Sequence, residues 1–169
     1  MALFGPPNVA KIKASNSIDA LVKAARYKKD PAIAEEARQA LEERLDIIVE
    51  NLQTKNMVQL QTSREALVLI GPAARDRLIF ILGEGHLHRR QDAAFVLGVM
   101  KDPVAVGPLC TAMHNPDPLL RMLCVEALGK IGDPAGIDTL RRALGDGEST
   151  VSTAARKSLK QMGVLPGAR

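Results

Sequence analysis

Aromatic side chains are scarce in this chain, which has no tryptophan, one tyrosine and three phenylalanines. They make up 2% of the residues, whereas hydrophobic residues of all kinds make up 46%. Sheets favour aromatic and β-branched residues, so a core of Leu, Ile, Val and Ala with few rings indicates closely packed helices. We therefore expect an all-α protein.

Cysteine is also rare, and Cys110 and Cys124 match no metal-ligand spacing and no Cys-x-x-Cys motif. Both lie in apolar surroundings, so we expect reduced, buried and inert thiols. The start, MALFGPPNVAK, contains Gly-Pro-Pro before any apolar signal region forms, and the longest apolar runs are too short to cross a bilayer. These absences predict a cytoplasmic protein with no membrane association.

An internal repeat is the strongest pattern in the chain. Residues 89–113 align with residues 120–144 without gaps at an offset of 31 residues. A further step of 31 reaches residues 152–163, and residues 64–82 fit with Leu67 at an offset of 61 from Leu128. Self-similarity at such a period is the signature of a repeat array.

Each copy of the repeat predicts two helices. Cys124, Leu128 and Ile131 recur at helical spacing, and a helix of this kind is expected to end at Gly132. Asp-Pro then begins the next helix, because Asp caps free N–H groups and Pro fits the first turn. This dipeptide recurs at 30–31, 102–103, 117–118 and 133–134. Stacked helix pairs bury their apolar faces together as an α-solenoid.

The segment from Asp117 to Pro134 follows the pattern Asp-Pro-x-x-Arg-x-x-x-x-x-Ala-Leu-Gly-x-Ile-Gly-Asp-Pro. This pattern resembles the HEAT-like repeat of the phycobilisome-lyase type, as in small prokaryotic members. The resemblance implies an armadillo-like superhelix of antiparallel helix pairs. We predict one repeat domain over residues 1–169, with a divergent first unit (1–55), repeat units at 56–85, 86–115, 116–146 and 147–163, and a tail at 164–169.

Two departures from the repeat are visible. Leu41 and Leu67 are only 26 residues apart, and LEERLDIIVE contains no helix breaker, which predicts one long helix over about residues 31–53. In addition, the slot of Arg90 and Arg121 is filled in the other copies by Ala34, Leu60 and Ser152. An arginine contact between repeats is therefore expected at most in the central units.

The glycines and histidines offer the first candidates for chemistry. No P-loop string occurs, and Gly98/Lys101-Asp102-Pro103 repeats as Gly129/Gly132-Asp133-Pro134, so a structural turn explains these stretches better than nucleotide binding. His86, His88 and His114 have no carboxylate or cysteine cluster at ligand spacing, so we expect solvent-facing side chains and no metal.

Deoxyhypusine hydroxylases, which share this repeat type, carry His-Glu pairs that hold two irons. Here the histidines are followed by Leu87, Arg89 and Asn115, so no His-Glu pair exists. The resemblance therefore implies that this activity is absent. No cysteine or serine lies in a nucleophile motif either, and we expect no catalytic residue and no cofactor.

The second helices supply the remaining candidates. At offsets of 31, one row holds Phe80, Thr111 and Arg142, and beside it lie Arg77, Pro108 and Thr139, flanked by Asp76 and Asp138. A groove that tracks phosphates would carry Lys or Arg in most repeats, so this mixed row makes nucleic acid an improbable partner.

We predict a non-enzymatic interaction or scaffold module that binds a protein or peptide on the concave face, lined by the second helices. The residues expected to bind the partner are Arg77, Phe80, Thr111, Thr139 and Arg142. Phe80 is either an exposed anchor or a ring packed under the helix at 31–53. Two alternatives stay open, which are a bilin-lyase-like chromophore-handling protein and a nucleic-acid-binding protein with a basic groove.

Overall fold

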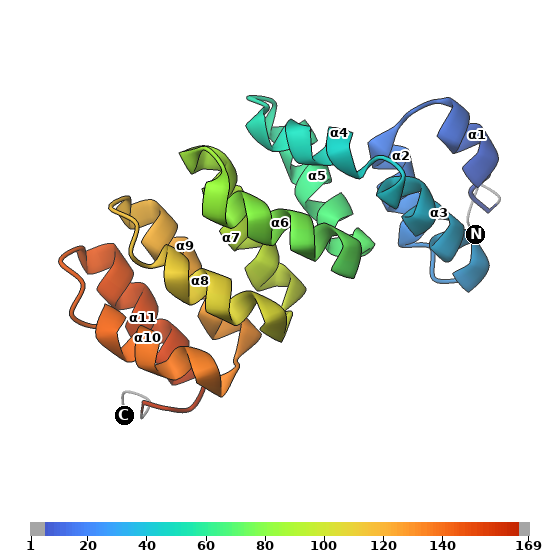
Figure 1. Cartoon of the computed structure of the whole chain (residues 1–169). Helices are drawn as coiled ribbons and strands as arrows, with labels where there is room; N and C mark the ends of the chain where they lie inside the picture. The colour runs from blue at the N-terminus through green and yellow to red at the C-terminus, as the bar shows by residue number, and fades with distance from the viewer. Residues whose placement is uncertain (1–5, 166–169) are drawn as a thin grey trace. The chain divides into compact units, whose positions relative to one another are not determined.

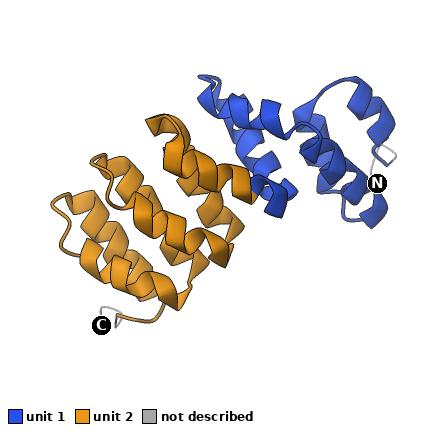
Figure 2. Cartoon of the chain, viewed as in Figure 1, with its two compact units in different colours: residues 1–74 blue, residues 75–169 orange. Residues whose placement is uncertain are grey.

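A computed structural model describes residues 6–165, which form helices and no strand within that range (Figure 1). The all-α prediction is confirmed. The chain divides into two compact units, residues 1–74 and residues 75–169 (Figure 2).

Four helices of unit 1 begin at polar caps. The side chains of Asn8, Ser17, Asp30 and Asn56 each accept a hydrogen bond from a backbone N–H group of the following turn. The elements are α1 (Val9–Ala14), α2 (Ile18–Ala25), α3 (Pro31–Glu42), α4 (Leu45–Glu50), the 3-10 helix η1 (Asn51–Gln53) and α5 (Met57–Ile70).

The prediction of one long helix over residues 31–53 is wrong, because α3 ends at Glu42 and α4 begins at Leu45. The break lies at Arg44, whose guanidinium donates to the carbonyl oxygens of Ala40 (2.8 Å) and Lys13 (3.1 Å). An arginine side chain that bonds these carbonyls ends the helix without glycine or proline, so no breaker was visible in the sequence.

Unit 2 continues the pattern of helix pairs. Asp102, Asp117 and Asp133 accept backbone N–H groups as predicted, and Gly132 ends its helix in the left-handed region at φ 75°. The elements are α6 (Pro72–Glu84), which begins at the end of unit 1, α7 (Leu87–Met100), η2 (Pro103–Ala105), α8 (Val106–Ala112), α9 (Pro118–Ile131), η3 (Pro134–Gly136), α10 (Ile137–Ala143) and α11 (Ser149–Gln161).

The first helices of successive pairs pack directly on one another, α7 on α9 and α9 on α11. Gly98 lies against Ala127, where an added Cβ would come within 2.7 Å of the Ala127 Cα atom. Gly129 lies equally close to Ser158, whose hydroxyl donates to the Val125 carbonyl at 3.1 Å. Gly98 and Gly129 thus permit close helix packing. The predicted turns follow them at Lys101 and Gly132, which end α7 and α9 in the left-handed region at φ 56° and 75°.

Candidate functional site

Two hollows lie between the second helices of unit 2. The first lies between α6 and α8 and has a volume of about 530 Å³; the second lies between α8 and α10 and has a volume of about 180 Å³. The first is lined by Ile79, Leu82, Gly83, Glu84, Arg90, Pro108, Thr111 and Ala112. The second is lined by Cys110, Met113, His114, Thr139, Arg142, Ala143 and Asp146.

The five predicted partner-binding residues do not line one common site in the structure. Thr111 lines the first hollow, whereas Thr139 and Arg142 line the second, where Arg142 Nη2 donates to Thr139 Oγ1 at 3.2 Å. Arg77 and Phe80 line neither hollow; the Arg77 guanidinium carbon lies 5.9 Å from the Phe80 ring centroid. Phe80 is 60% exposed, so its ring is not packed under another described element.

Arg121, at the arginine position of its repeat, has a carboxylate partner. Its Nε and Nη2 atoms each donate to a carboxylate oxygen of Asp146 at 2.8 Å, and Nη1 donates to the carbonyls of Asn115 and Pro116. The hydrogen bond from Arg121 is the main reason that the pKa of Asp146 lies below its ordinary value, although burial opposes that shift. This pair joins α9 to the loop between α10 and α11 and neutralises both charges.

Arg90 occupies the same slot one repeat earlier, and the residue 31 positions before Asp146 is Asn115. The two side chains are oriented alike: Asn115 Oδ1 accepts from the N–H group of Asp117 at 2.9 Å, as Asp146 Oδ1 accepts from that of Glu148 at 3.0 Å. An amide has only one acceptor oxygen and no negative charge. The partner that Arg121 has is therefore missing for Arg90.

Arg90 instead faces the first hollow without a counter-ion. Its Nε atom is buried and has no hydrogen-bond partner, and the guanidinium forms no ion pair with any residue of the range 6–165. Most of the other lining residues are apolar, and Thr111 and Glu84 are the polar ones. Such a guanidinium suits a carboxylate, which can accept two parallel N–H groups.

Arg90 was not among the residues predicted from the sequence as partner-binding. The repeat alignment shows which copies carry an arginine at this position. It does not show that the arginine pairs with the residue 25 positions later, which is Asp146 for Arg121 and Asn115 for Arg90. The signal was the change from Asp146 to Asn115 at the repeat offset of 31.

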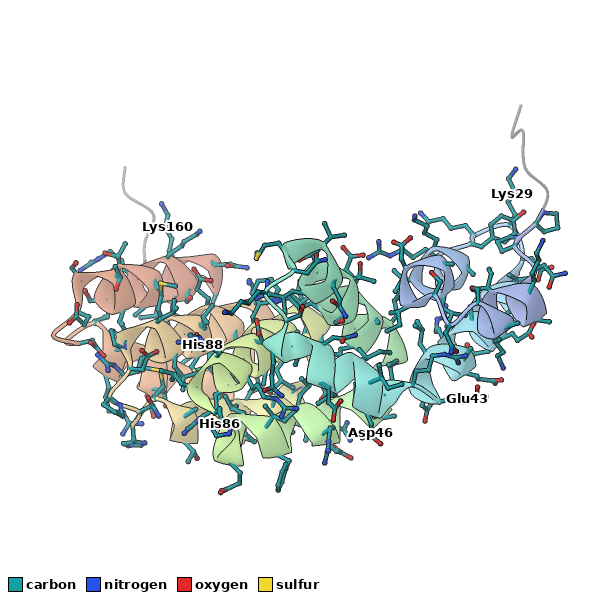
Figure 3. All side chains as sticks on the ribbon, turned by 90° about the horizontal axis from the view of Figure 1, so that it is seen from above. Lys29, Glu43, Asp46, His86, His88 and Lys160 are labelled. Carbon is teal, nitrogen blue, oxygen red and sulfur yellow. The ribbon has the colours of Figure 1, made fainter. Side chains whose placement is uncertain are left out.

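The histidines do not form a site with the other titratable residues. His86, His88 and His114 are exposed, and His86 and His88 can be located at the start of α7 in Figure 3. His88 Nδ1 lies 3.4 Å from Gln91 Oε1, and His114 Nδ1 lies 3.1 Å from the Thr111 carbonyl. Among the described residues, no three His, Cys, Asp or Glu side chains are grouped so that they could hold a metal ion.

The two cysteines differ in accessibility. Cys124 is buried, and burial raises the pKa of its thiol to about 12, as expected of an inert side chain. Cys110 is only half-buried and lines the second hollow, so the expectation that both thiols are buried is wrong for this one. The Cys110 side chain faces the gap between α8 and α10.

Comparisons with known proteins identify the repeat. The model of the family described as HEAT repeats matches residues 72–160, which is more than half of the chain. Deoxyhypusine hydroxylase of Gallus gallus is 36% identical over 74 residues, which are 43% of this chain and 25% of that protein. Deoxyhypusine hydroxylase-B of Oryza sativa subsp. japonica is 32% identical over 94 residues, which are 54% of this chain and 31% of that protein.

Solved structures share the fold at lower identity. Human deoxyhypusine hydroxylase in complex with glycerol has a TM-score of 0.58 at 20% identity, covering 92% of this chain and 76% of that one. The complex of CpcE and CpcF of phycocyanin lyase from Nostoc sp. has a TM-score of 0.55 at 20% identity, covering 96% and 68%. Both likenesses support the solenoid fold.

The prediction of a non-enzymatic scaffold module is wrong, because the curated relatives that match are named as an enzyme. The matched segments are between a quarter and a third of the length of the two relatives above. The two irons implied for deoxyhypusine hydroxylase do not fit the described residues, which offer no cluster of metal-ligating side chains. No described helix is long and apolar enough to cross a membrane.

Proposed function

We propose that this chain, which belongs to the HEAT repeat family, takes part in an enzymatic reaction as the part that binds the substrate. The substrate is a protein or peptide, and one of its carboxylate groups binds to Arg90 in the hollow between α6 and α8. The reacting groups come from outside the described residues.

The unpaired guanidinium of Arg90 is the observation that carries this proposal. A partly buried charge without a partner is costly, whereas its equivalent Arg121 is fully paired. A ligand carboxylate would supply the two oxygens that Asp146 supplies to Arg121. The open, mainly apolar walls leave room for the rest of the ligand.

The charge in the hollow favours a carboxylate over a phosphate. The lining contains one arginine, Arg90, and one acidic residue, Glu84, and this balance of charge disfavours a dianion. A groove for nucleic acid would need several such cations in a row. A peptide side chain that ends in a single carboxylate fits the charge of this site.

The enzymatic part of the proposal is supported by the named relatives, and the misfit of the irons limits it to substrate binding. The finer assignment to the phycobilisome-lyase repeat type rests on the pattern from Asp117 to Pro134. A cytoplasmic location likewise stays part of the proposal.

Quantitative mass spectrometry of cellular proteins tests the function and identifies the substrate in the same measurement. Cells that lack this protein are compared with cells that regain the wild type, the variant Arg90→Gln or the control Arg156→Gln, an exposed arginine on α11. We expect at least one modified peptide to disappear on deletion and to return with the wild type and Arg156→Gln but not with Arg90→Gln. Unchanged modifications across all four strains would overturn the proposal.

A further inference from the structure

A separate polar hollow of about 410 Å³ lies in unit 1, where the α1–α2 turn, η1 and the start of α5 come together. Four side-chain amides line it, from Asn16, Asn51, Asn56 and Gln59. No lysine or arginine belongs to its lining among the described residues. The site is therefore rich in hydrogen-bonding groups but has no cation.

The fold already occupies the acceptor oxygens of these amides. Asn16 Oδ1 accepts from Arg44 Nη2 at 3.4 Å, and Asn51 Oδ1 accepts from Gln59 Nε2 at 2.8 Å. Asn56 Oδ1 caps α5 by accepting the N–H groups of Val58 and Gln59 at 3.0 and 3.2 Å. These bonds fix which end of each amide remains available.

Three of the four amides keep unused donor groups. The NH₂ groups of Asn16, Asn51 and Asn56 donate to no other residue within 6–165. Ser63, which belongs to the lining and is 1% exposed, has a hydroxyl without any hydrogen-bond partner in that range. A buried hydroxyl without a partner is uncommon in native proteins and indicates a missing group.

Apolar surface adjoins these donors. Val58 lines the hollow and is 76% exposed, and its neighbour Met57 is 69% exposed. The first turn of α5 therefore presents two large apolar side chains to solvent beside a row of amide donors. A ligand for this place has uncharged acceptors on one side and an apolar group on the other.

We propose that this hollow binds the main chain of an extended, uncharged peptide segment. Its carbonyl oxygens accept from Asn51 and Asn56, and an apolar side chain packs on Val58. Carbonyls recur every ~3.3 Å along an extended chain, so several of them reach the donors at once. Asp19 is the only carboxylate-bearing residue in the described lining, and its negative charge disfavours an anionic ligand.

The test uses ¹⁵N-labelled protein and the capped peptide acetyl-Ser-Leu-Ser-Leu-Ser-amide. We expect the side-chain amide signals of Asn51 and Asn56 to shift saturably during the titration. The double variant Asn51→Asp/Asn56→Asp keeps both acceptor oxygens, including the α5 cap, but removes both donors. It should bind the peptide at least about tenfold more weakly, whereas the control Gln53→Glu, an exposed residue outside the hollow, should bind unchanged.

Equal peptide affinity of the double variant and the wild type would overturn the proposal. So would shifts caused by maltopentaose and not by the peptide, which would indicate a carbohydrate site. If the double variant melts at a lower temperature, the wild type is titrated with a peptide whose two central amides are alkene isosteres. This analogue should bind at least about tenfold more weakly, and undiminished binding would contradict the role of the carbonyls.

Discussion

Asn115→Asp should restore the ion pair that Arg90 lacks. The substituted side chain keeps one oxygen on the N–H group of Asp117, as Asp146 keeps one on that of Glu148, and offers the second oxygen to Arg90. In the reference pair, the side chains of Arg121 and Asp146 are 16% and 12% exposed and share two hydrogen bonds of 2.8 Å. A pair with so little exposure contributes more to the free energy of unfolding than an exposed pair, which contributes about 0.2–1 kcal/mol.

We therefore expect the free energy of unfolding to rise by roughly 1–2 kcal/mol, since hydrogen bonds to charged groups contribute about 1.5–3 kcal/mol before desolvation of the new carboxylate. For a chain of this size that corresponds to a rise in Tm of about 2–8 °C. Thermal unfolding followed by circular dichroism measures the change at low and high salt. In the Arg90→Gln background the same substitution should give no stabilisation. An equal gain with and without Arg90 would refute the pairing.

Three further predictions concern the fold of unit 2. Gly129→Ala should lower the free energy of unfolding by about 1–3 kcal/mol, measured by urea unfolding, because the added Cβ would lie 2.4 Å from Ser158 Oγ. The control Gly107→Ala, whose added Cβ would meet no atom within 4 Å, should be neutral or stabilising. Iodoacetamide at pH 8 should label Cys110 and spare Cys124, whose pKa of about 12 keeps it protonated; equal labelling in intact-mass spectra would contradict the burial. Asp146 has a lowered pKa in the folded state, so its contribution to stability is complete above about pH 4 and is lost as the pH falls through the folded pKa. Arg121→Gln should therefore flatten the dependence of Tm on pH below about pH 4, and an unchanged slope would argue against the pair.

The repeat made the fold predictable, because its helix stops and starts are local. Asp117-Pro118 and Gly132 act through their own backbone geometry, which a sequence displays directly. The break at Arg44 was not predictable, since it depends on a carbonyl of Lys13 that is distant in the sequence. Local signals therefore predicted most helix ends, and a long-range contact determined the exception.

The candidate sites were less predictable than the fold. Thr111, Thr139 and Arg142 were correctly placed on the second helices, but the residue that distinguishes one hollow is Arg90, on a first helix. Arg90 lacks a counter-ion because Asn115 stands where the next copy of the repeat has Asp146. Recognising this from the sequence requires knowing that the arginine position and the Asn115/Asp146 position lie close together in the fold. The amide hollow of unit 1 lies outside the repeat pattern, so no periodicity indicated it.

The central claim is that Arg90 binds a ligand carboxylate, and NMR of its side chain tests this most directly. The Arg90 Nε–H signal is followed while N-acetyl-leucine, which has one carboxylate and an apolar side chain, is added. We expect a saturable shift that N-acetyl-leucinamide does not produce and that Asn115→Asp abolishes by occupying the guanidinium. A signal that moves equally with the acid and the amide, or with neither, would contradict the claim.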